Sequence, residues 1–302
     1  MSNINLIIEE RAVNIGKFMV GRLLPFRQKR MVGPFIYIDH MGPVKLNERE
    51  NFDVMPHPHI GLSTLTFLFE GNIMHRDTLG TEVEIKSGAV NWMTAGKGVQ
   101  HSEMFPLVYE DKENPMELFQ IWLNLPSKSK NVEPHFKMMW GEKIPKITYK
   151  DLQNRETKIE VIVGNLPNTK ANTPPPNSWA ANPQNEVAVW NIKLQSNAEF
   201  VLPKASKGIN RTLYFYEGDE ILIDNVTVNR YHSVEVLSHV DLKINNKNHP
   251  SSILVLQGKP INEPVIQYGP FVMNTKEEIH QAFDFFGVTS VNRSMIFNGP
   301  LL

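Results

Sequence analysis

Two short segments of the chain each place two potential metal ligands two residues apart. A His-Pro-His unit carries His57 and His59, and a His-Ser-Glu unit carries His101 and Glu103. Side chains at positions i and i+2 of an extended strand point to the same side of the backbone. If the fold brings the two segments together, we expect a metal site with three imidazoles and one carboxylate. Such a site leaves coordination positions open on an octahedral ion, where chemistry can take place.

The ligand types indicate which metals could bind. Three imidazoles and one carboxylate suit Fe(II), Mn(II), Ni(II), Co(II) or Cu(II), and Zn(II) is compatible with the same set. The chain has no cysteine, so a thiolate site, a disulfide framework and a cysteine nucleophile are all excluded. Because each ligand must be deprotonated at the metal, we expect occupancy to fall in acid.

The composition describes a globular protein without a strong charge. The 302 residues are 41% hydrophobic and 21% charged, enough for two domains and a sizeable core. A formal net charge of −1 argues against direct binding to nucleic acid or to an anionic membrane. Two short basic clusters, at residues 27–30 and 128–130, are interpreted as solvated loops. The sequence shows no secretory signal and no apolar run of membrane-spanning length, so the expected location is the cytoplasm.

Short β-rich segments with glycine turns between them dominate the first half of the chain. Many short strands separated in this way predict an all-β barrel or sandwich. Residues 126–150 show little strand periodicity and are interpreted as an interdomain connection. A long proline-containing loop at residues 166–183 is expected to wrap the surface, with a lid over a pocket as the alternative. The expected strands are residues 63–69, 73–77, 82–86, 89–94, 119–123 and 159–163.

One helix is expected near the end of the chain. Thr275 is a plausible N-cap, and apolar residues follow at i, i+3, i+4 and i+7 from Ile279. Gly287 lies just past the predicted end. We expect this helix to pack its apolar stripe on a barrel.

The two halves of the chain resemble each other. Residues 54–71 align with residues 201–218, and the Glu-Gly pairs that end both segments, at Glu70 and Glu217, differ by 147 positions. In this alignment Lys204 replaces His57 and Ser206 replaces His59, and no second-half counterpart of the His-Ser-Glu unit is found. A charged lysine has no lone pair for a metal. The second half is therefore predicted to be metal-free, and the histidines are not expected to be needed for the fold.

The other histidines are interpreted separately. His75 could line the pocket or support a ligand, against the alternative of an ordinary strand position. His40 lies in a turn-like segment and is interpreted as structural, and residues 91–94 are expected to contribute both core and pocket wall. Signatures of other catalytic sites are missing: there is no Walker A loop, dinucleotide-binding glycine fingerprint or Gly-x-Ser-x-Gly elbow.

These motifs together resemble the pirin family of the cupin superfamily, and the resemblance spans nearly the whole chain. The first half carries it most strongly. The Glu-Gly pair, the Gly-Val-Gln-His-Ser-Glu run, and a Gly-Pro-Phe-Val-Met-Asn-Thr segment near the end all belong to it. The residues that carry it are 32–35, 39–43, 57–61, 70–71, 75–77, 92–96, 98–103, 122–126 and 269–275.

The resemblance implies two cupin-type jelly-roll β-barrels packed together, with a short C-terminal helix. The expected division is an N-terminal metal-binding barrel at residues 1–135 and a C-terminal metal-free barrel with the terminal helix at residues 136–302. The family binds one metal, usually iron, and the matching ligand positions are His57, His59, His101 and Glu103. The family often has arginine after the His-Pro-His unit, where this chain has Ile60. A partner contact or pocket charge that depends on that arginine is therefore in doubt here.

The resemblance also implies a function. We expect a metal-dependent dioxygenase that cleaves quercetin-like flavonols or related enolic aromatics with O2, in which Glu103 takes the proton of the substrate hydroxyl. Glu103 could instead serve only as a ligand, and the sequence does not separate these roles. The alternative function is a metal- or redox-responsive regulator that binds a transcription factor or a metabolic enzyme. A non-oxidative cupin, such as an isomerase, is ranked third.

Overall fold

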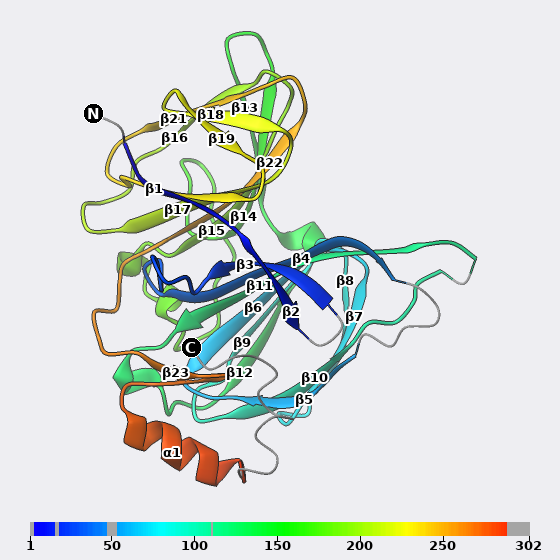
Figure 1. Ribbon diagram of the computed structural model, residues 1–302, viewed down its shortest axis with the longest axis vertical. Coiled ribbons are helices and arrows are strands. Elements are labelled where there is room, and N and C mark those ends of the chain that lie inside the picture. The colour runs from blue at the N-terminus through cyan, green and yellow to red at the C-terminus, as the bar shows by residue number, and fades with distance from the viewer. Residues whose placement is uncertain (1–2, 16–17, 47–52, 110, 289–302) are drawn as a thin grey trace.

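The protein consists of two β-barrels stacked along its long axis, with one helix at the far end of the N-terminal barrel (Figure 1). The computed structural model describes residues 3–15, 18–46, 53–109 and 111–288. Almost all of the regular structure is β-strand, so the predicted all-β class is confirmed. Within the described residues, no helix is long and apolar enough to cross a membrane.

The N-terminal barrel packs a seven-stranded sheet against a four-stranded one. All of its strand pairs are antiparallel. In spatial order the large sheet is β12 (His135–Met139), β9 (Val90–Thr94), β6 (Leu62–Glu70), β11 (Asn114–Asn124), β4 (Phe35–Leu46), β3 (Phe18–Leu24) and β2 (Arg11–Ile15). The small sheet is β5 (Val54–His59), β10 (Val99–Met104), β7 (Asn72–Asp77) and β8 (Glu82–Lys86).

The C-terminal barrel repeats this plan with one seven-stranded and one four-stranded sheet. Its large sheet is β1 (Ile4–Glu9), β20 (His232–Val236), β17 (Asn210–Glu217), β22 (Ser251–Gly258), β15 (Ala188–Leu194), β14 (Glu156–Val163) and β13 (Lys146–Lys150). Its small sheet is β16 (Glu199–Leu202), β21 (Leu242–Asn246), β18 (Glu220–Ile223) and β19 (Val226–Asn229). Short 3-10 helices lie at Ser127–Ser129, Gly141–Lys143, Trp179–Ala181 and Pro183–Asn185.

The internal repeat is visible in the matching strand orders. The order β5-β10-β7-β8 in the first barrel corresponds to β16-β21-β18-β19 in the second. β21 therefore occupies the place of the ligand-bearing strand β10, although the sequence showed no counterpart there. β16 ends at Leu202, so Lys204 and Ser206 lie beyond the strand, whereas His57 and His59 are still within β5.

The interiors of the two barrels differ in polarity. Across the β6–β11 pair, Gln120 lies opposite Thr66, whose hydroxyl donates to the Gln120 amide oxygen at 2.8 Å. At the matching place in the second barrel, Val255 lies opposite Leu213, and both are fully buried in an apolar cluster. Because both barrels fold on the same plan, the polar interior of the first barrel is not a requirement of the fold.

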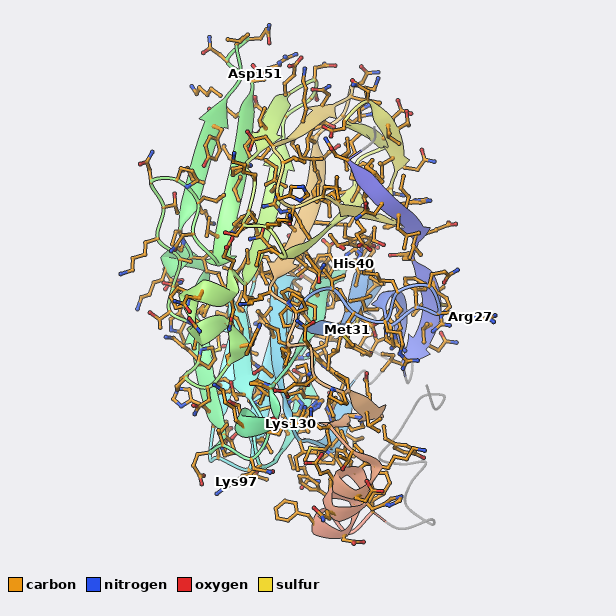
Figure 2. All side chains as sticks on the ribbon, turned by 90° about the vertical axis from the view of Figure 1, so that its left-hand side faces the viewer. Arg27, Met31, His40, Lys97, Lys130 and Asp151 are labelled. Atoms are coloured by element: carbon orange, nitrogen blue, oxygen red, sulfur yellow. The ribbon has the colours of Figure 1, made fainter. Side chains whose placement is uncertain are left out.

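A shared apolar core joins the two barrels. Phe119 from the first barrel packs against Tyr214 and Tyr216 from the second. His40 stacks on Phe119 with ring centroids 4.5 Å apart and lies between the barrels (Figure 2). Its position in β4, with Nε2 2.9 Å from a Glu117 carboxylate oxygen, fits the structural role expected for it, but the segment is a strand and not a turn.

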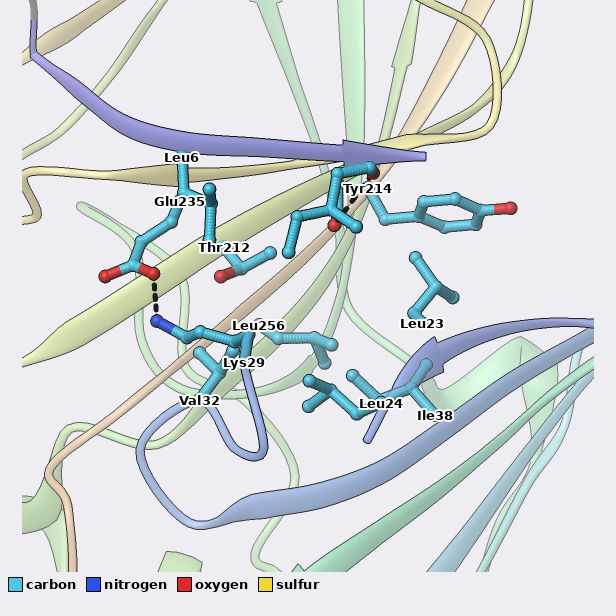
Figure 3. A pocket seen from close by; sticks show the side chains of 12 residues that line it. Leu6, Leu23, Leu24, Lys29, Val32, Ile38, Thr212, Tyr214, Glu235 and Leu256 are labelled. Carbon is cyan, nitrogen blue, oxygen red and sulfur yellow. Dashed lines mark hydrogen bonds and ion pairs between the residues drawn. The ribbon is translucent and has the colours of Figure 1, made fainter. Parts of the chain in front are cut away.

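An apolar pocket also lies between the barrels, beneath β1 (Figure 3). On one side lie Leu6 and Leu256 from the large sheet of the C-terminal barrel, and they face Leu24 and Ile38 from the large sheet of the N-terminal barrel. The Lys29–Glu235 ion pair lines one end of the pocket. This cleft contains no group of potential metal ligands among the described residues. Lys29 belongs to the basic cluster that was expected to be solvated, but its side chain is partly buried in this ion pair.

Residues 126–150, interpreted as an interdomain connection with little strand periodicity, run from the first barrel to the second and contain two strands. β12 extends the first large sheet beside β9, and β13 forms an edge of the second beside β14. Exposed residues (Lys146, Thr148 and Lys150) alternate with half-buried ones in β13, and lysines are common on exposed sheet edges. β1 lies in the second barrel although it begins the chain. The division at residue 135 stays a prediction. β12 lies in the first barrel but runs past residue 135, and β1 lies in the second barrel but precedes that residue.

The predicted helix is present as α1 (Lys276–Phe285). The Thr275 side chain accepts from the Glu278 backbone, and Glu278 accepts in return from the Thr275 backbone, which completes a capping box. Ile279 and Phe283 pack against β24 (Phe271–Met273), which pairs with β23 (Ile266–Tyr268). The 166–183 loop packs Trp179 and Ala180 against the core between the barrels, which agrees with a surface-wrapping segment.

Candidate metal centre

β5 and β10 place the predicted ligands on neighbouring strands. The two strands are antiparallel, and His101 lies directly opposite His57 in the register. A register shift between His101 and Glu103 puts Glu103 opposite Val54. The expectation that the two ligand segments come together agrees with this sheet, but the register shift was not predicted.

The structure divides the predicted ligands into two overlapping groups. Possible ligand atoms of His57, His59 and His101 lie within 4.8 Å of one another, and so do those of His75, His101 and Glu103. His101 belongs to both groups. Glu103 is thus on the same inner face as the three imidazoles but is grouped with His75, which was considered only as a pocket or supporting residue.

The three-histidine group is tightly packed. The Nε2 atoms of His57 and His59 are 3.2 Å apart, and the ring centroids of His57 and His101 are 4.4 Å apart. The Nδ1–H of His57 can donate to the Met55 carbonyl at 2.9 Å, which leaves its Nε2 lone pair facing the other histidines. Two imidazole nitrogens that both present lone pairs repel each other unless a proton or a cation lies between them.

Several buried polar atoms in this region have no hydrogen-bond partner. They are Nδ1 of His59, Nε2 of His101 and Oε1 of Glu103. An unpaired buried polar atom usually costs 1–3 kcal/mol, as an order of magnitude, so a cluster of three calls for an explanation. A divalent cation among His57, His59 and His101 would satisfy Nε2 of His101 directly, and the Glu103 carboxylate, which is grouped with His101 and His75, lies beside it. The donor set therefore fits a metal of the type expected from the sequence.

Burial sets the protonation of the ligands. His59, His101 and Glu103 are 2%, 4% and 8% exposed. Burial lowers the pKa of His57 and lowers the pKa values of His59 and His101 well below their usual range. Burial also raises the pKa of Glu103 to about 7. The imidazoles are therefore neutral and ready to bind, while the carboxylate gains most from a nearby cation.

Metal affinity should depend on pH in a defined way. Below about pH 7 the metal must displace a proton from Glu103, so we expect affinity to fall by up to about tenfold per pH unit, and more steeply where the histidines protonate. Competition with a chelator of known affinity, measured between about pH 5 and pH 8, checks this. An affinity that stays constant over this range would contradict it.

An aromatic wall stands beside the ligands. Trp122 stacks on Tyr37 with centroids 4.1 Å apart and meets the His59 ring edge-to-face at 5.1 Å. Behind Tyr37, the Arg22 guanidinium binds both carboxylate oxygens of Asp39 at 2.8 Å. Residues 91–94 were expected to contribute both core and pocket wall: Trp92 lies in the core between the barrels, and Asn91 Nδ2 lies 3.4 Å from Nδ1 of His75. The alternation of inward residues along β11 was the available signal for Trp122.

Lys130 holds the turn that follows His59. Although the basic cluster at residues 128–130 was expected to be solvated, Lys130 is only 1% exposed. Its ammonium donates to the Gly61 and Val272 carbonyls, both at 2.9 Å, and to the Asn124 amide oxygen at 2.7 Å. Three oxygens from three distant segments replace its water shell, a combination that local sequence does not reveal.

Ile60 has a packing role in this chain. It is 5% exposed and lies in a cluster with Phe271, Met273 and the apolar face of α1. Its side chain is thus directed to the helix that covers this end of the barrel. Ile60, at the position where the family resemblance implied arginine, therefore makes an apolar contact between the His-Pro-His strand and α1.

The fold and the polar, histidine-rich interior define a bicupin protein with a candidate metal centre in its N-terminal barrel. Sequence comparison identifies the family. The profile described as pirin matches residues 17–123, and the pirin C-terminal cupin domain matches residues 189–289. This chain belongs to the pirin family.

Individual relatives agree with this assignment. The chain is 34% identical over 286 residues to a pirin-like protein of Caulobacter vibrioides, with 92% of this chain and 91% of the relative covered. It is 35% identical over 231 residues to pirin of Homo sapiens, with 75% and 73% covered. Among solved structures, a quercetin 2,3-dioxygenase from Acinetobacter baumannii matches with a TM-score of 0.82, 28% identity and 98% of each chain covered.

Proposed function

We propose that this pirin-family protein is a metal-dependent dioxygenase that cleaves quercetin-like flavonols or related enolic aromatics with O2. The observation that carries the proposal is the cluster of buried, unpartnered ligand atoms on the inner face of the first barrel. The structural match to a quercetin 2,3-dioxygenase supports the choice of reaction.

We propose that His57, His59, His101 and Glu103 hold one divalent transition metal, with Fe(II) preferred and Mn, Ni, Co, Cu or Zn as alternatives. The bound metal would supply Lewis acidity toward the substrate oxygens. Burial lowers the pKa values of all three histidines, so they are neutral and their lone pairs are available without prior loss of a proton. The low exposure of the site also keeps competing water away from them.

Glu103 is proposed as the base of the reaction. Burial raises the pKa of Glu103 to about 7 in the metal-free site, and a bound cation would hold the carboxylate ionised, in the form that accepts a proton. It would accept the proton of the substrate hydroxyl. The stacked and largely buried Trp122 and Tyr37 rings form an apolar wall beside His59, an environment compatible with an aromatic substrate.

Oxygen uptake tests the proposed function. Metal-loaded protein, chelated protein and the His57→Ala variant are each mixed with quercetin and a small panel of enolic aromatics. We expect oxygen uptake only from the metal-loaded wild type, because the variant loses one of the three clustered imidazoles. Equal uptake by the variant and the wild type would refute the assignment. No uptake by the loaded wild type with any member of the panel would favour the regulatory alternative.

A further inference from the structure

A histidine and an aspartate are completely buried behind the candidate metal centre. His75 and Asp77 lie two residues apart on the inner face of β7, and neither side chain is exposed. His75 Nε2 is 3.0 Å from the Asp77 carboxylate oxygen Oδ2. On its other side, His75 Nδ1 is 3.5 Å from Nδ1 of His101. The three side chains form a line from the carboxylate to a candidate ligand.

The positions of the protons along this line follow from the carboxylate. A carboxylate can only accept, so Nε2 of His75 carries the hydrogen and its Nδ1 is a bare acceptor. Asn91 Nδ2, 3.4 Å away, and His101 Nδ1, 3.5 Å away, both lie within reach of this lone pair. It favours a hydrogen on Nδ1 of His101, which leaves Nε2 bare. Nε2 of His101 is the atom found buried without a partner.

We propose that Asp77 and His75 are positioning residues that fix the tautomer of His101, so that its Nε2 lone pair faces His57 and His59. The inference rests on the metal centre of the proposed function and adds residues to it. Partners that orient a metal-binding imidazole through its second nitrogen typically change metal affinity by about 10- to 100-fold.

The second barrel shows that the fold does not require this pair. In the first barrel, His101 lies opposite Asp77 and Glu103 lies opposite His75. The corresponding strands β21 and β18 contain no histidine, and they pair Ile244 with Ile223. Both isoleucines are fully buried. A buried polar pair is costly unless it is well bonded, so its presence in only one barrel points to a role there.

The other oxygen of Asp77 makes a sharp test possible. Oδ1 accepts from the backbone N–H groups of Leu79 and Thr81, at 2.9 and 3.0 Å. In an Asp77→Asn variant this turn holds the amide oxygen, so the amide nitrogen must face His75. His75 Nε2 would then have to accept, its Nδ1 would carry the hydrogen, and His101 would move its hydrogen to Nε2. The Asp77→Asn substitution is therefore expected to move the hydrogen to the other ring nitrogen in both His75 and His101, with almost no change in shape.

Long-range proton–nitrogen NMR of metal-free protein labelled with 15N-histidine reports each tautomer directly. The His101 signals are assigned by their loss in a His101→Gln variant. We expect His101 to carry its hydrogen on Nδ1 in the wild type and on Nε2 in Asp77→Asn. We also expect the zinc affinity of Asp77→Asn, measured by chelator competition, to fall by about 10- to 100-fold. Asp151→Asn is the matched control, because Asp151 Oδ1 accepts from a similar turn at Gln153 and Arg155, far from the site.

The outcomes separate the two proposals. A wild-type His101 with its hydrogen on Nε2, or an Asp77→Asn variant with unchanged tautomer and zinc affinity, would overturn the positioning role. Two zinc ions per chain would also overturn it, because Nδ1 of His75 and His101 would then be ligands. If the wild type binds zinc but consumes no oxygen with any substrate, the dioxygenase proposal fails while the positioning role stands.

Discussion

Replacing His57 by lysine is expected to abolish stable metal binding while leaving the fold intact. Lysine is the residue at the aligned position of the second half, Lys204. A charged ammonium offers no lone pair and would repel a cation held by His59 and His101. Since changing the outer partners of ligands already costs about 10- to 100-fold in affinity, loss of a ligand should exceed about 100-fold.

The fold should tolerate this change because His57 is partly exposed, so a lysine side chain at this position can extend its ammonium group into water. We expect the free energy of unfolding of the metal-free protein to change by less than about 1 kcal/mol. His135→Lys is the matched control, since His135 is an exposed histidine on β12 of the same barrel. Metal content after dialysis and urea unfolding of the chelated proteins check both parts. A His57→Lys variant that keeps one tightly bound metal would show that this histidine is not a ligand.

The Glu103→Gln variant is expected to make the metal-free protein more stable at alkaline pH. Burial raises the pKa of Glu103 from 4.5 to about 7, so the folded state prefers the protonated carboxyl. Below pH 4.5 the group is protonated in both states and costs nothing. Between 4.5 and about 7 the unfolded state gains by ionising, so stability is progressively lost as pH rises, and the full penalty, about 3 kcal/mol, applies above pH 7.

Glutamine has the shape of glutamate without its charge. The Glu103→Gln variant should therefore gain stability only at pH values where ionisation of Glu103 destabilises the wild type. Urea unfolding of chelated protein at about pH 4 and pH 8 should show no gain at the lower pH and the full gain at the higher one. The same variant should lose metal affinity, which identifies Glu103 as a group kept for binding at a cost in stability. Glu82→Gln, an exposed change on β8, is the control and should be neutral at both values. An equal effect at both pH values would contradict the assigned cause.

The local parts of this architecture could be predicted from sequence. The spacing of two placed His57 with His59, and the capping residues placed α1, because both depend on neighbours within one strand or one turn. The repeat indicated two barrels because the Glu-Gly turn recurs with the same strands on either side.

Features that depend on distant segments were not predictable in the same way. β1 joins the second barrel by pairing with β20, more than two hundred residues away. Lys130 is buried because oxygens from residues 61, 124 and 272 meet around it. The grouping of Glu103 with His75 follows from a register shift in β10 and from the pairing of β10 with β7. Each of these needs the three-dimensional arrangement first.

The central claim is that the first barrel holds one metal with His57, His59, His101 and Glu103. Elemental analysis of the purified protein, followed by anomalous X-ray scattering from its crystals, tests this most directly. The account predicts one transition-metal atom per chain and a single anomalous peak within bonding distance of the four side chains. A peak in the second barrel, or metal-loaded protein with no peak among these residues, would contradict it.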